Sequence, residues 1–209
     1  MVVHAQAHWE RIYEEKAPDE VSWYESVPRA SLELIEEARV ARDAAILDVG
    51  GGASGLAGRL LDAGYTDITV ADISGRALDR ARAALGEDAD RVAWVEADVR
   101  EHDFGRRFDL WHDRAAFHFM VEGADRAAYL ETLRGTLGPS GHLIVATFGP
   151  EGPTRCSGLP VSRYGAPAIA ELLPDFELVS SRLELHHTPS GTAQQFLYAH
   201  LRRVEAPDS

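Results

Sequence analysis

Residues 45–55 read Ala45-Ile46-Leu47-Asp48-Val49-Gly50-Gly51-Gly52-Ala53-Ser54-Gly55, an apolar run that ends in an acid and is followed by glycines at 50, 52 and 55. Glycine lets the backbone turn sharply off a strand and approach a ligand closely, and the start of a following helix offers unpaired N–H groups. Several classes of nucleotide-binding protein share this G-x-G-x-x-G spacing, and a glycine-rich turn without a ligand has it too. The stretch predicts a strand, a tight turn and a helix.

Two later apolar runs also end in an acid. Residues 66–72 end at Asp72, and residues 92–98 end at Asp98. In a doubly wound sheet, the carboxyl end of the second strand places a carboxylate where it can accept hydrogen bonds from ribose hydroxyls. An aspartate at a strand end is also a common turn residue, so each acid alone has a structural interpretation. Three strand-ending acids in succession, Asp48 before the glycine loop and two after it, favour a nucleotide-like ligand.

The alternation of strand and helix patterns predicts an α/β fold. We expect a doubly wound, mostly parallel seven-stranded sheet with helices on both faces and a C-terminal antiparallel hairpin. Gly138-Pro139-Ser140-Gly141 reads as a tight turn before the fifth strand. The expected helices cover about 5–16, 28–42, 54–63, 74–85, 125–137 and 166–173, and the expected strands cover about 45–49, 67–72, 91–97, 108–112, 142–148, 176–186 and 194–203.

Together with Asp72 and Glu96-Ala97-Asp98, the stretch 46–52 resembles the class I S-adenosylmethionine-dependent methyltransferases, and the resemblance covers most of the chain. The acid two residues before Gly50 and the helical sequence before the first strand distinguish it from an NAD-binding Rossmann domain. The resemblance implies S-adenosyl-L-methionine as the cofactor. It further implies that the glycine loop lies against the methionine part, Asp72 holds the ribose and Asp98 reaches the adenine amino group.

Aromatic residues are concentrated near the N-terminus. Trp9 and Tyr13 lie four residues apart, on one face of the expected helix, and Trp23-Tyr24 follow. Small-molecule and lysine-directed members of the resembling family have a similar pattern, which suggests a lid that excludes water and offers aromatic faces to a sulfonium cation. A helix packed on the sheet by its aromatics is the structural alternative, and both can hold. The expected cofactor-binding residues are Trp9, Tyr13, Asp48, Gly50, Gly52, Asp72, Ile73, Asp98 and Val99, with Asp48 supporting the glycine loop.

Ligands of open parallel sheets bind beyond the carboxyl ends of the strands, so the segment after the fourth strand is a candidate for catalysis. His118 is a candidate general base, because histidine titrates near neutral pH. The alternative role of His118 is structural, with its ring packed beside Phe117 and Phe119. Asp113 is the second catalytic candidate, and its alternative is to hold the loop by pairing with a charge such as Arg114.

Residues 149–164 form a second candidate segment, because a long irregular loop inside a compact domain is usually functional or disordered. Its arginines and tyrosine suit an anionic or carboxylated acceptor, and Cys156 either contacts that acceptor or acts as a small buried hydrophobe. The segment after the fourth strand has no Asn/Asp-Pro-Pro-aromatic motif, which nucleobase-directed family members usually carry. The expected acceptor-binding residues are Trp23, Tyr24, Arg155, Cys156, Arg163 and Tyr164.

Histidines raise the question of a metal site, and the sequence predicts none. His186 and His187 are adjacent, so in a strand they point to opposite faces and cannot both bind one ion. His112, His118 and Cys156 are further candidate ligands, but no pair of these candidates has a characteristic metal-binding spacing.

Composition limits the partners. The chain has 209 residues, one cysteine and a formal net charge of −13, which argues against nucleic acid because phosphate neutralisation drives that affinity. No apolar run is long enough to span a bilayer and no leader pattern is present, so we expect a cytoplasmic protein without a membrane partner. We expect one domain over residues 1–209, with an N-terminal helical lid at 1–43 and a cofactor-binding core at 44–209. The oligomeric state does not follow from the sequence.

The resemblance implies methyl transfer from S-adenosylmethionine to a nucleophilic atom of a small molecule. The sulfonium is already a strong electrophile, so alignment of donor and acceptor is the main task of the protein. Protein lysine methylation and a non-catalytic cofactor-binding role are alternatives, and an NAD-dependent oxidoreductase is disfavoured by Asp48. The acceptor atom cannot be deduced from residue types.

Overall fold

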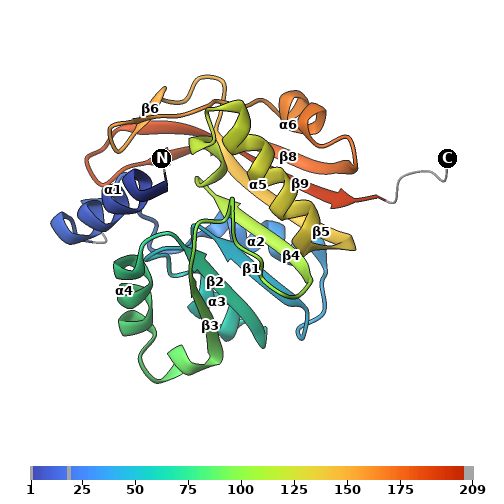
Figure 1. The fold of residues 1–209 in the computed structure, drawn as a ribbon, viewed down its shortest axis with the longest axis horizontal. Helices are drawn as coiled ribbons and strands as arrows, with labels where there is room; N and C mark the ends of the chain where they lie inside the picture. Colours follow the sequence, from blue (N-terminus) through green and yellow to red (C-terminus); the bar gives the residue numbers. More distant parts are fainter. Residues whose placement is uncertain (1, 18–19, 205–209) are drawn as a thin grey trace.

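The central element of the protein is a seven-stranded sheet, seen in a computed structural model that describes residues 2–17 and 20–204 (Figure 1). The strand order is β3-β2-β1-β4-β5-β9-β8. Every pair from β3 to β5 is parallel, whereas β9 runs antiparallel to both β5 and β8. This topology confirms the predicted sheet and its closing hairpin. The strands are β1 Ala45–Val49, β2 Asp67–Asp72, β3 Val92–Glu96, β4 Phe108–Arg114, β5 Leu137–Phe148, β8 Phe176–His187 and β9 Ala193–Arg203.

Helices cover both faces of the sheet because the inner strands are apolar on both sides. Every residue of β1 is buried, and its side chains alternate between two cores: Ile46 belongs to one and Leu47 to the other. The first core receives α2, α3 and α4, and the second receives α5 and α6. In Figure 1, α5 and α6 lie in front of the sheet and α2 and α3 behind it. The helices are α1 Val2–Glu15, α2 Arg29–Ala38, α3 Leu56–Asp62, α4 Gly75–Leu85, α5 Gly123–Thr136 and α6 Ala166–Leu172.

The N-terminal helix α1 packs against α4 by polar contacts. Arg76 Nε lies 3.0 Å from Glu10 Oε2, and Arg80 Nη1 donates to the carbonyl oxygen of Lys16 over 2.5 Å. Since α4 follows β2, these contacts hold α1 beside the carboxyl end of that strand. The lid helix predicted from the aromatics therefore lies at the edge of the sheet where ligands bind.

Two element boundaries differ from the prediction. A Cβ on Gly141 would lie 3.1 Å from the carbonyl oxygen of Gly138 and 2.6 Å from Leu137 Cγ, so the tight turn expected at 138–141 is present. These residues nevertheless belong to β5, which begins at Leu137 rather than at His142. Its pairing with β4 is irregular between Phe108 and Leu110, and such a bulge accommodates a glycine and a proline in a strand. The second helix ends at Ala38, because Arg39 adopts a left-handed conformation (φ 52°) that terminates it.

The loop at 149–164 contains a small hairpin that sequence reasoning missed. Strands β6 (Arg155–Cys156) and β7 (Leu159–Pro160) pair antiparallel. They are joined by Ser157 (φ 48°) and Gly158 (φ 80°), the two left-handed residues of a type I′-like turn. Strands of two residues have no detectable periodicity, which explains the omission. Among the described residues, no helix has the length and apolar character needed to cross a membrane.

Candidate functional site

A cavity of about 460 Å³ lies at the carboxyl ends of the parallel strands. It is lined by residues that follow β1, β2, β3 and β4, by α1, by the segment before α2 and by the β6–β7 hairpin. The volume is in the lower part of the range for small-molecule sites, about 300–1,000 Å³. Seven of the nine residues predicted to bind the cofactor line it: Trp9, Tyr13, Gly50, Asp72, Ile73, Asp98 and Val99.

The glycine loop needs its glycines for close approach. Gly50 has φ +64° and its N–H donates to the carbonyl oxygen of Ala71 over 2.8 Å, while a Cβ there would lie 2.7 Å from Ala116 Cβ. Gly52 has φ +46°, and a Cβ would lie 2.6 Å from Tyr13 Oη and 3.0 Å from Asp72 Oδ2. Gly52 does not line the cavity itself; it allows Tyr13 and Asp72 to meet there.

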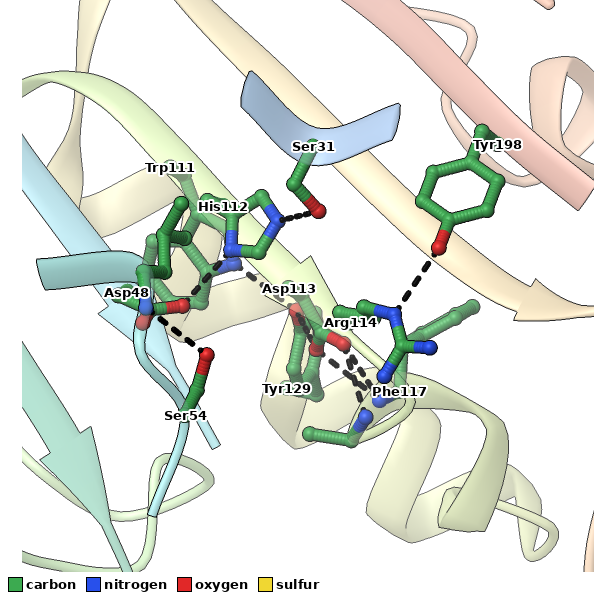
Figure 2. Close-up of polar contacts among 12 residues, drawn as sticks. Ser31, Asp48, Ser54, Trp111, His112, Asp113, Arg114, Phe117, Tyr129 and Tyr198 are labelled. Carbon is green, nitrogen blue, oxygen red and sulfur yellow. Dashed lines mark hydrogen bonds and ion pairs between the residues drawn. The ribbon is translucent and has the colours of Figure 1, made fainter. Parts of the chain in front are cut away.

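Asp48 lies beneath the glycine loop rather than in the cavity. Its Oδ1 lies 2.7 Å from His112 Nδ1, and His112 Nε2 lies 2.8 Å from Ser31 Oγ (Figure 2). All three side chains are buried. A Cβ on Gly51 would lie 2.5 Å from Asp48 Oδ2, so this carboxylate is packed directly against the loop. The contact is consistent with the predicted support of the loop by Asp48, and the chain Asp48–His112–Ser31 ties β1 to β4 and α2.

Asp72 combines burial with a position in the cavity. Its Oδ1 accepts a hydrogen bond from the Ser74 N–H over 2.8 Å, and the side chain is almost fully buried. Burial raises the pKa of Asp72 to about 7, and the nearby charge of Asp48 contributes. A buried carboxylate with spare acceptor capacity suits hydroxyl donors, which would favour its ionised form.

Asp98 is held by Arg100, a residue that the sequence analysis did not identify. Arg100 donates from Nε to Asp98 Oδ1 over 2.9 Å and from Nη2 to Asp98 Oδ2 over 2.5 Å. Its Nη1 reaches Asp125 Oδ1 of α5 over 2.6 Å. Burial alone would raise the pKa of Asp98, but the hydrogen bonds from Arg100 outweigh it and leave this pKa below its ordinary value. The spacing Asp98-x-Arg100 is the sequence signal that could have identified Arg100 as the partner of Asp98.

The two predicted catalytic residues lie outside the cavity lining. His118 is fully buried, and its Nδ1 accepts from the Phe148 N–H over 3.4 Å. Burial lowers its pKa to about 3, with the charge of Arg114 contributing, so the ring is neutral near pH 7. Ala115, with φ 71°, precedes the short 3-10 helix Phe117–Phe119, which turns His118 inward. This placement argues against direct contact with an acceptor and favours the packed alternative.

Asp113 holds the loop after β4 through hydrogen bonds rather than through the expected pairing with a charge such as Arg114. It is fully buried, and its carboxylate accepts hydrogen bonds from the N–H groups of Ala116 and Phe117 and, over 2.6 Å, from Tyr129 Oη (Figure 2). Burial raises its pKa to about 6, although these hydrogen bonds oppose the rise. Asp113 therefore shapes the turn after β4 and does not face the cavity.

Of the six predicted acceptor-binding residues, only Trp23 and Cys156 line the cavity. Arg155 donates to the carbonyl oxygen of Gly158 within its own hairpin, and Arg163 donates to that of Gly152. Tyr24 is exposed, and Tyr164 is buried against Phe117, with ring planes inclined by 27° and centroids 5.5 Å apart. These last four residues do not come together at the cavity. Burial raises the pKa of the Cys156 thiol, as expected for a small buried residue.

An aromatic cluster forms one wall of the cavity. The Trp9 ring lies 5.0 Å from that of Phe119 and 5.8 Å from that of Trp23 (centroid distances), with edge-to-face geometry. Met120, Leu159 and Arg114 complete this part of the lining. Sequence reasoning found Trp9 and Trp23 but missed Phe119 and Arg114, because only the tertiary structure places the end of β4 beside the N-terminal segment.

Within the described chain, no group of three or more histidine, cysteine, aspartate or glutamate side chains converges where a metal ion could bind. His186 is engaged instead with Glu25 (Nδ1 to Oε1, 3.4 Å) and with the carbonyl oxygen of Ser22 (2.7 Å from Nε2). His187, on the opposite face of β8, is exposed.

Comparisons with known proteins agree with this geometry. Residues 46–141 match the family described as "Methyltransferase domain". A curated relative, the ubiquinone/menaquinone biosynthesis C-methyltransferase UbiE of Paracoccus denitrificans, is 36% identical over 107 residues, which cover 49% of this chain and 42% of the relative. The matched region thus spans less than half of that relative's length.

Solved structures share the fold over nearly the whole chain. A SAM-dependent methyltransferase from Anabaena variabilis has a TM-score of 0.75 at 17% identity, with 95% of each chain covered. The 1,6-didemethyltoxoflavin-N1-methyltransferase of Burkholderia thailandensis, solved with 1,6-didemethyltoxoflavin and S-adenosylhomocysteine bound, has a TM-score of 0.68 at 23% identity, covering 97% of this chain and 85% of its own. Residues 46–141, a little under half of the chain, thus match a methyltransferase domain, and nearly the whole chain shares the fold of solved S-adenosylmethionine-dependent methyltransferases. The match indicates S-adenosylmethionine as the cofactor.

Proposed function

We propose that the protein transfers the methyl group of S-adenosylmethionine to a nucleophilic atom of a small molecule held in the cavity. The observation that carries this proposal is the continuity of one cavity from the glycine loop to the aromatic wall. The same cavity therefore offers a place for the donor beside Asp72 and Asp98 and a place for an acceptor beside Trp9 and Trp23. The solved relative with a bound small-molecule substrate supports the same reading.

Each part of the lining has a distinct role in this proposal. Asp72 accepts hydrogen bonds from the ribose hydroxyls, and Asp98, oriented by Arg100, faces the adenine. The bound cofactor supplies an electrophilic methyl group. Trp9 and Tyr13 on α1 close the cavity, exclude water and present aromatic faces to the sulfonium charge.

The protein contributes mainly alignment. Neither His118 nor Asp113 lines the cavity, so the reaction proceeds without either as a general base. Holding donor and acceptor in line converts a bimolecular step into an effectively unimolecular one, which is a large source of rate acceleration. We propose that residues 1–43 act as the lid of a single domain that extends over 1–209.

The proposal is tested with S-adenosylmethionine that carries a labelled methyl group, incubated with the purified protein and with lysate separated into small-molecule and macromolecular fractions. We expect label in the small-molecule fraction, and mass spectrometry of the product then identifies the methylated atom. Excess S-adenosylhomocysteine should abolish the transfer. Label on one macromolecular band would instead favour protein lysine methylation, and cofactor binding without any transfer would favour a non-catalytic role.

A pair of tryptophan variants localises the activity. Trp9→Ala should lower the transfer rate, because it opens the wall of the cavity. Trp94→Ala is the matched control, since Trp94 lies on β3 and packs beside Arg82 outside the cavity lining. Thermal unfolding of both variants checks that they fold. Equal loss of transfer in the two folded variants would contradict the proposed site.

A further inference from the structure

The acceptor end of the cavity differs from the cofactor end in its charge. At the cofactor end, the ionisable side chains Asp72, Asp98, Arg100 and Asp125 line the cavity, with the exposed Glu122 beside them. We define the rest of the lining as the acceptor end, and it is aromatic and aliphatic apart from three residues, His8, Arg114 and Cys156. The charge preference of the acceptor site therefore depends on these three side chains.

Among the described residues, Arg114 is the only arginine or lysine that lines this end of the cavity. Its positive charge is compensated by the carboxylate of Glu25. Its Nη2 lies 2.9 Å from Glu25 Oε1, and the two side chains are only 11% and 22% exposed. Its Nε donates to Tyr198 Oη and its Nη1 to the carbonyl oxygen of Trp23, both over 2.9 Å (Figure 2 shows the Tyr198 bond). The charge of the guanidinium is thus compensated within the protein, although Nη2 meets Glu25 without hydrogen-bond geometry.

The neighbours of Glu25 keep its side chain ionised, so that it can compensate the charge of Arg114. Burial would raise its pKa, but His186 and Arg114 outweigh burial and lower it, so Glu25 is ionised near neutral pH. His186 Nδ1 lies 3.4 Å from the same oxygen that Arg114 contacts. The carboxylate is therefore available to compensate the arginine whenever an acceptor binds.

The other two polar residues add no charge. Burial lowers the pKa of His8, as does the charge of Arg11, so this imidazole is neutral near pH 7. Burial raises the pKa of Cys156, so its thiol is protonated there. The arginines that an anionic acceptor would need, Arg155 and Arg163, donate to carbonyl oxygens of their own loop.

We infer, resting on the proposed function, that the acceptor is a small uncharged molecule with an aromatic or otherwise apolar body, and that Glu25 sets this preference by neutralising Arg114. An anion would meet a guanidinium whose charge Glu25 already compensates, and the lining residues of the acceptor end include no carboxylate to bind a cation. Transfer of an ion into such a site is costly, whereas an apolar ring gains from burial beside Trp9, Trp23 and Phe119. Since the cofactor shares the cavity of about 460 Å³, the acceptor is small.

Three probes of nearly equal size and different charge test the inference: benzyl alcohol, benzoate and benzylamine. Their binding to the protein saturated with S-adenosylhomocysteine is measured by calorimetry or ligand-observed NMR near pH 7.5. We expect benzyl alcohol to bind at least tenfold more tightly than either ion. Tighter binding of benzoate or of benzylamine, or no binding of any probe, would overturn the inference.

A charge-release variant tests the role of Glu25. In Glu25→Gln the arginine loses its compensating charge, so benzoate should bind at least tenfold more tightly than to the native protein, while benzyl alcohol changes less than twofold. Glu33→Gln is the matched control, because Glu33 pairs with Arg182 at the surface and should leave all three affinities unchanged. Unaltered benzoate binding to folded Glu25→Gln would overturn the assigned role.

These measurements are independent of the proposed function. They report binding at the acceptor end and require no turnover. Selective binding of benzyl alcohol without any labelled methyl transfer would leave the inference standing and count against the methyltransferase activity. Methyl transfer to a charged metabolite would support the methyltransferase activity and overturn the inference about the acceptor.

Discussion

Asp72→Asn should have opposite effects on the stability of the protein and on its affinity for the cofactor. Burial raises the pKa of Asp72 from 3.8 to about 7. At about 1.4 kcal/mol for each pH unit, the ionised carboxylate costs the folded state about 4 kcal/mol. The asparagine side chain of the variant retains part of the desolvation cost, but it can still accept the hydrogen bond from the Ser74 N–H. We therefore expect the cofactor-free variant to gain about 1–4 kcal/mol of stability.

The sign of the pH dependence follows from linkage. Between pH 3.8 and about 7, folded Asp72 holds more protons than unfolded Asp72, so this residue makes the native protein less stable as the pH rises through that window. The stability gain of Asp72→Asn should therefore be near zero at pH 4 and complete above pH 7. For a chain of this size, each kcal/mol raises Tm by about 2–4 °C.

Cofactor affinity should change in the other direction. Loss of a charged acceptor for the ribose hydroxyls costs about 1.5–3 kcal/mol, which weakens S-adenosylhomocysteine binding about 10- to 100-fold. Thermal unfolding at pH 4.5 and pH 8, together with calorimetric titration, measures both effects. Asp67→Asn is the matched control, because Asp67 lies at the other end of β2 and pairs with Arg106 at the surface, so its stability effect should stay within about 1 kcal/mol. A stability gain that is equal at both pH values, or an unchanged affinity, would refute this reasoning.

Three further substitutions test other parts of the site. Gly50→Ala should destabilise the protein by about 1–3 kcal/mol and abolish measurable S-adenosylhomocysteine binding, because Gly50 has φ +64° and the new Cβ would lie 2.7 Å from Ala116 Cβ; Gly123→Ala, where a Cβ meets open space, is the control in chemical denaturation. Arg100→Gln should weaken S-adenosylhomocysteine binding about tenfold, since Asp98 loses its orientation and about 1.5 kcal/mol of charged hydrogen bonding. Arg91→Gln, which removes only the exposed pair with Asp88, should bind normally in the same titration. His118, with its pKa near 3, binds a proton less readily when folded, so the native protein loses stability as the pH falls below about 6.5, and His118→Gln should reduce that loss in melts at pH 7 and pH 4.5. A folded His118→Gln protein that has lost methyl transfer more than a hundredfold would restore His118 as a catalytic candidate.

The cofactor half of the site could be predicted because its signals are local in sequence. Asp48, the glycines and Asp72 follow directly from strand ends and a tight turn, and parallel pairing brings those strand ends to one edge. Asp98 belongs to the same pattern, although its arginine partner was overlooked. The constraints that fix these positions, the end of a strand and the turn that follows it, act within a few residues of each motif.

The acceptor half could not be predicted in the same way. The orientation of His118 depends on the left-handed Ala115 and on packing against Phe148, whose ring centroid lies 4.7 Å away, and neither has a sequence signature. Arg155 and Arg163 looked like ligands for an anion, but the turns of their own loop use their N–H groups. Only tertiary packing brings Phe119 beside Trp9, because 110 positions of chain separate them.

The division of the cavity has a consequence for engineering. The lining residues that we assign to the donor, Gly50, Asp72 and Asp98, follow the strands β1–β3, whereas Trp9, Trp23 and Cys156, which we assign to the acceptor wall, come from segments on either side of residues 46–141. Arg114 and Phe119 of the same wall lie inside 46–141, so exchange of the flanking segments between relatives would change only part of the acceptor wall. Under the proposed function, a change of acceptor therefore requires the flanking segments and the end of β4 to be exchanged together.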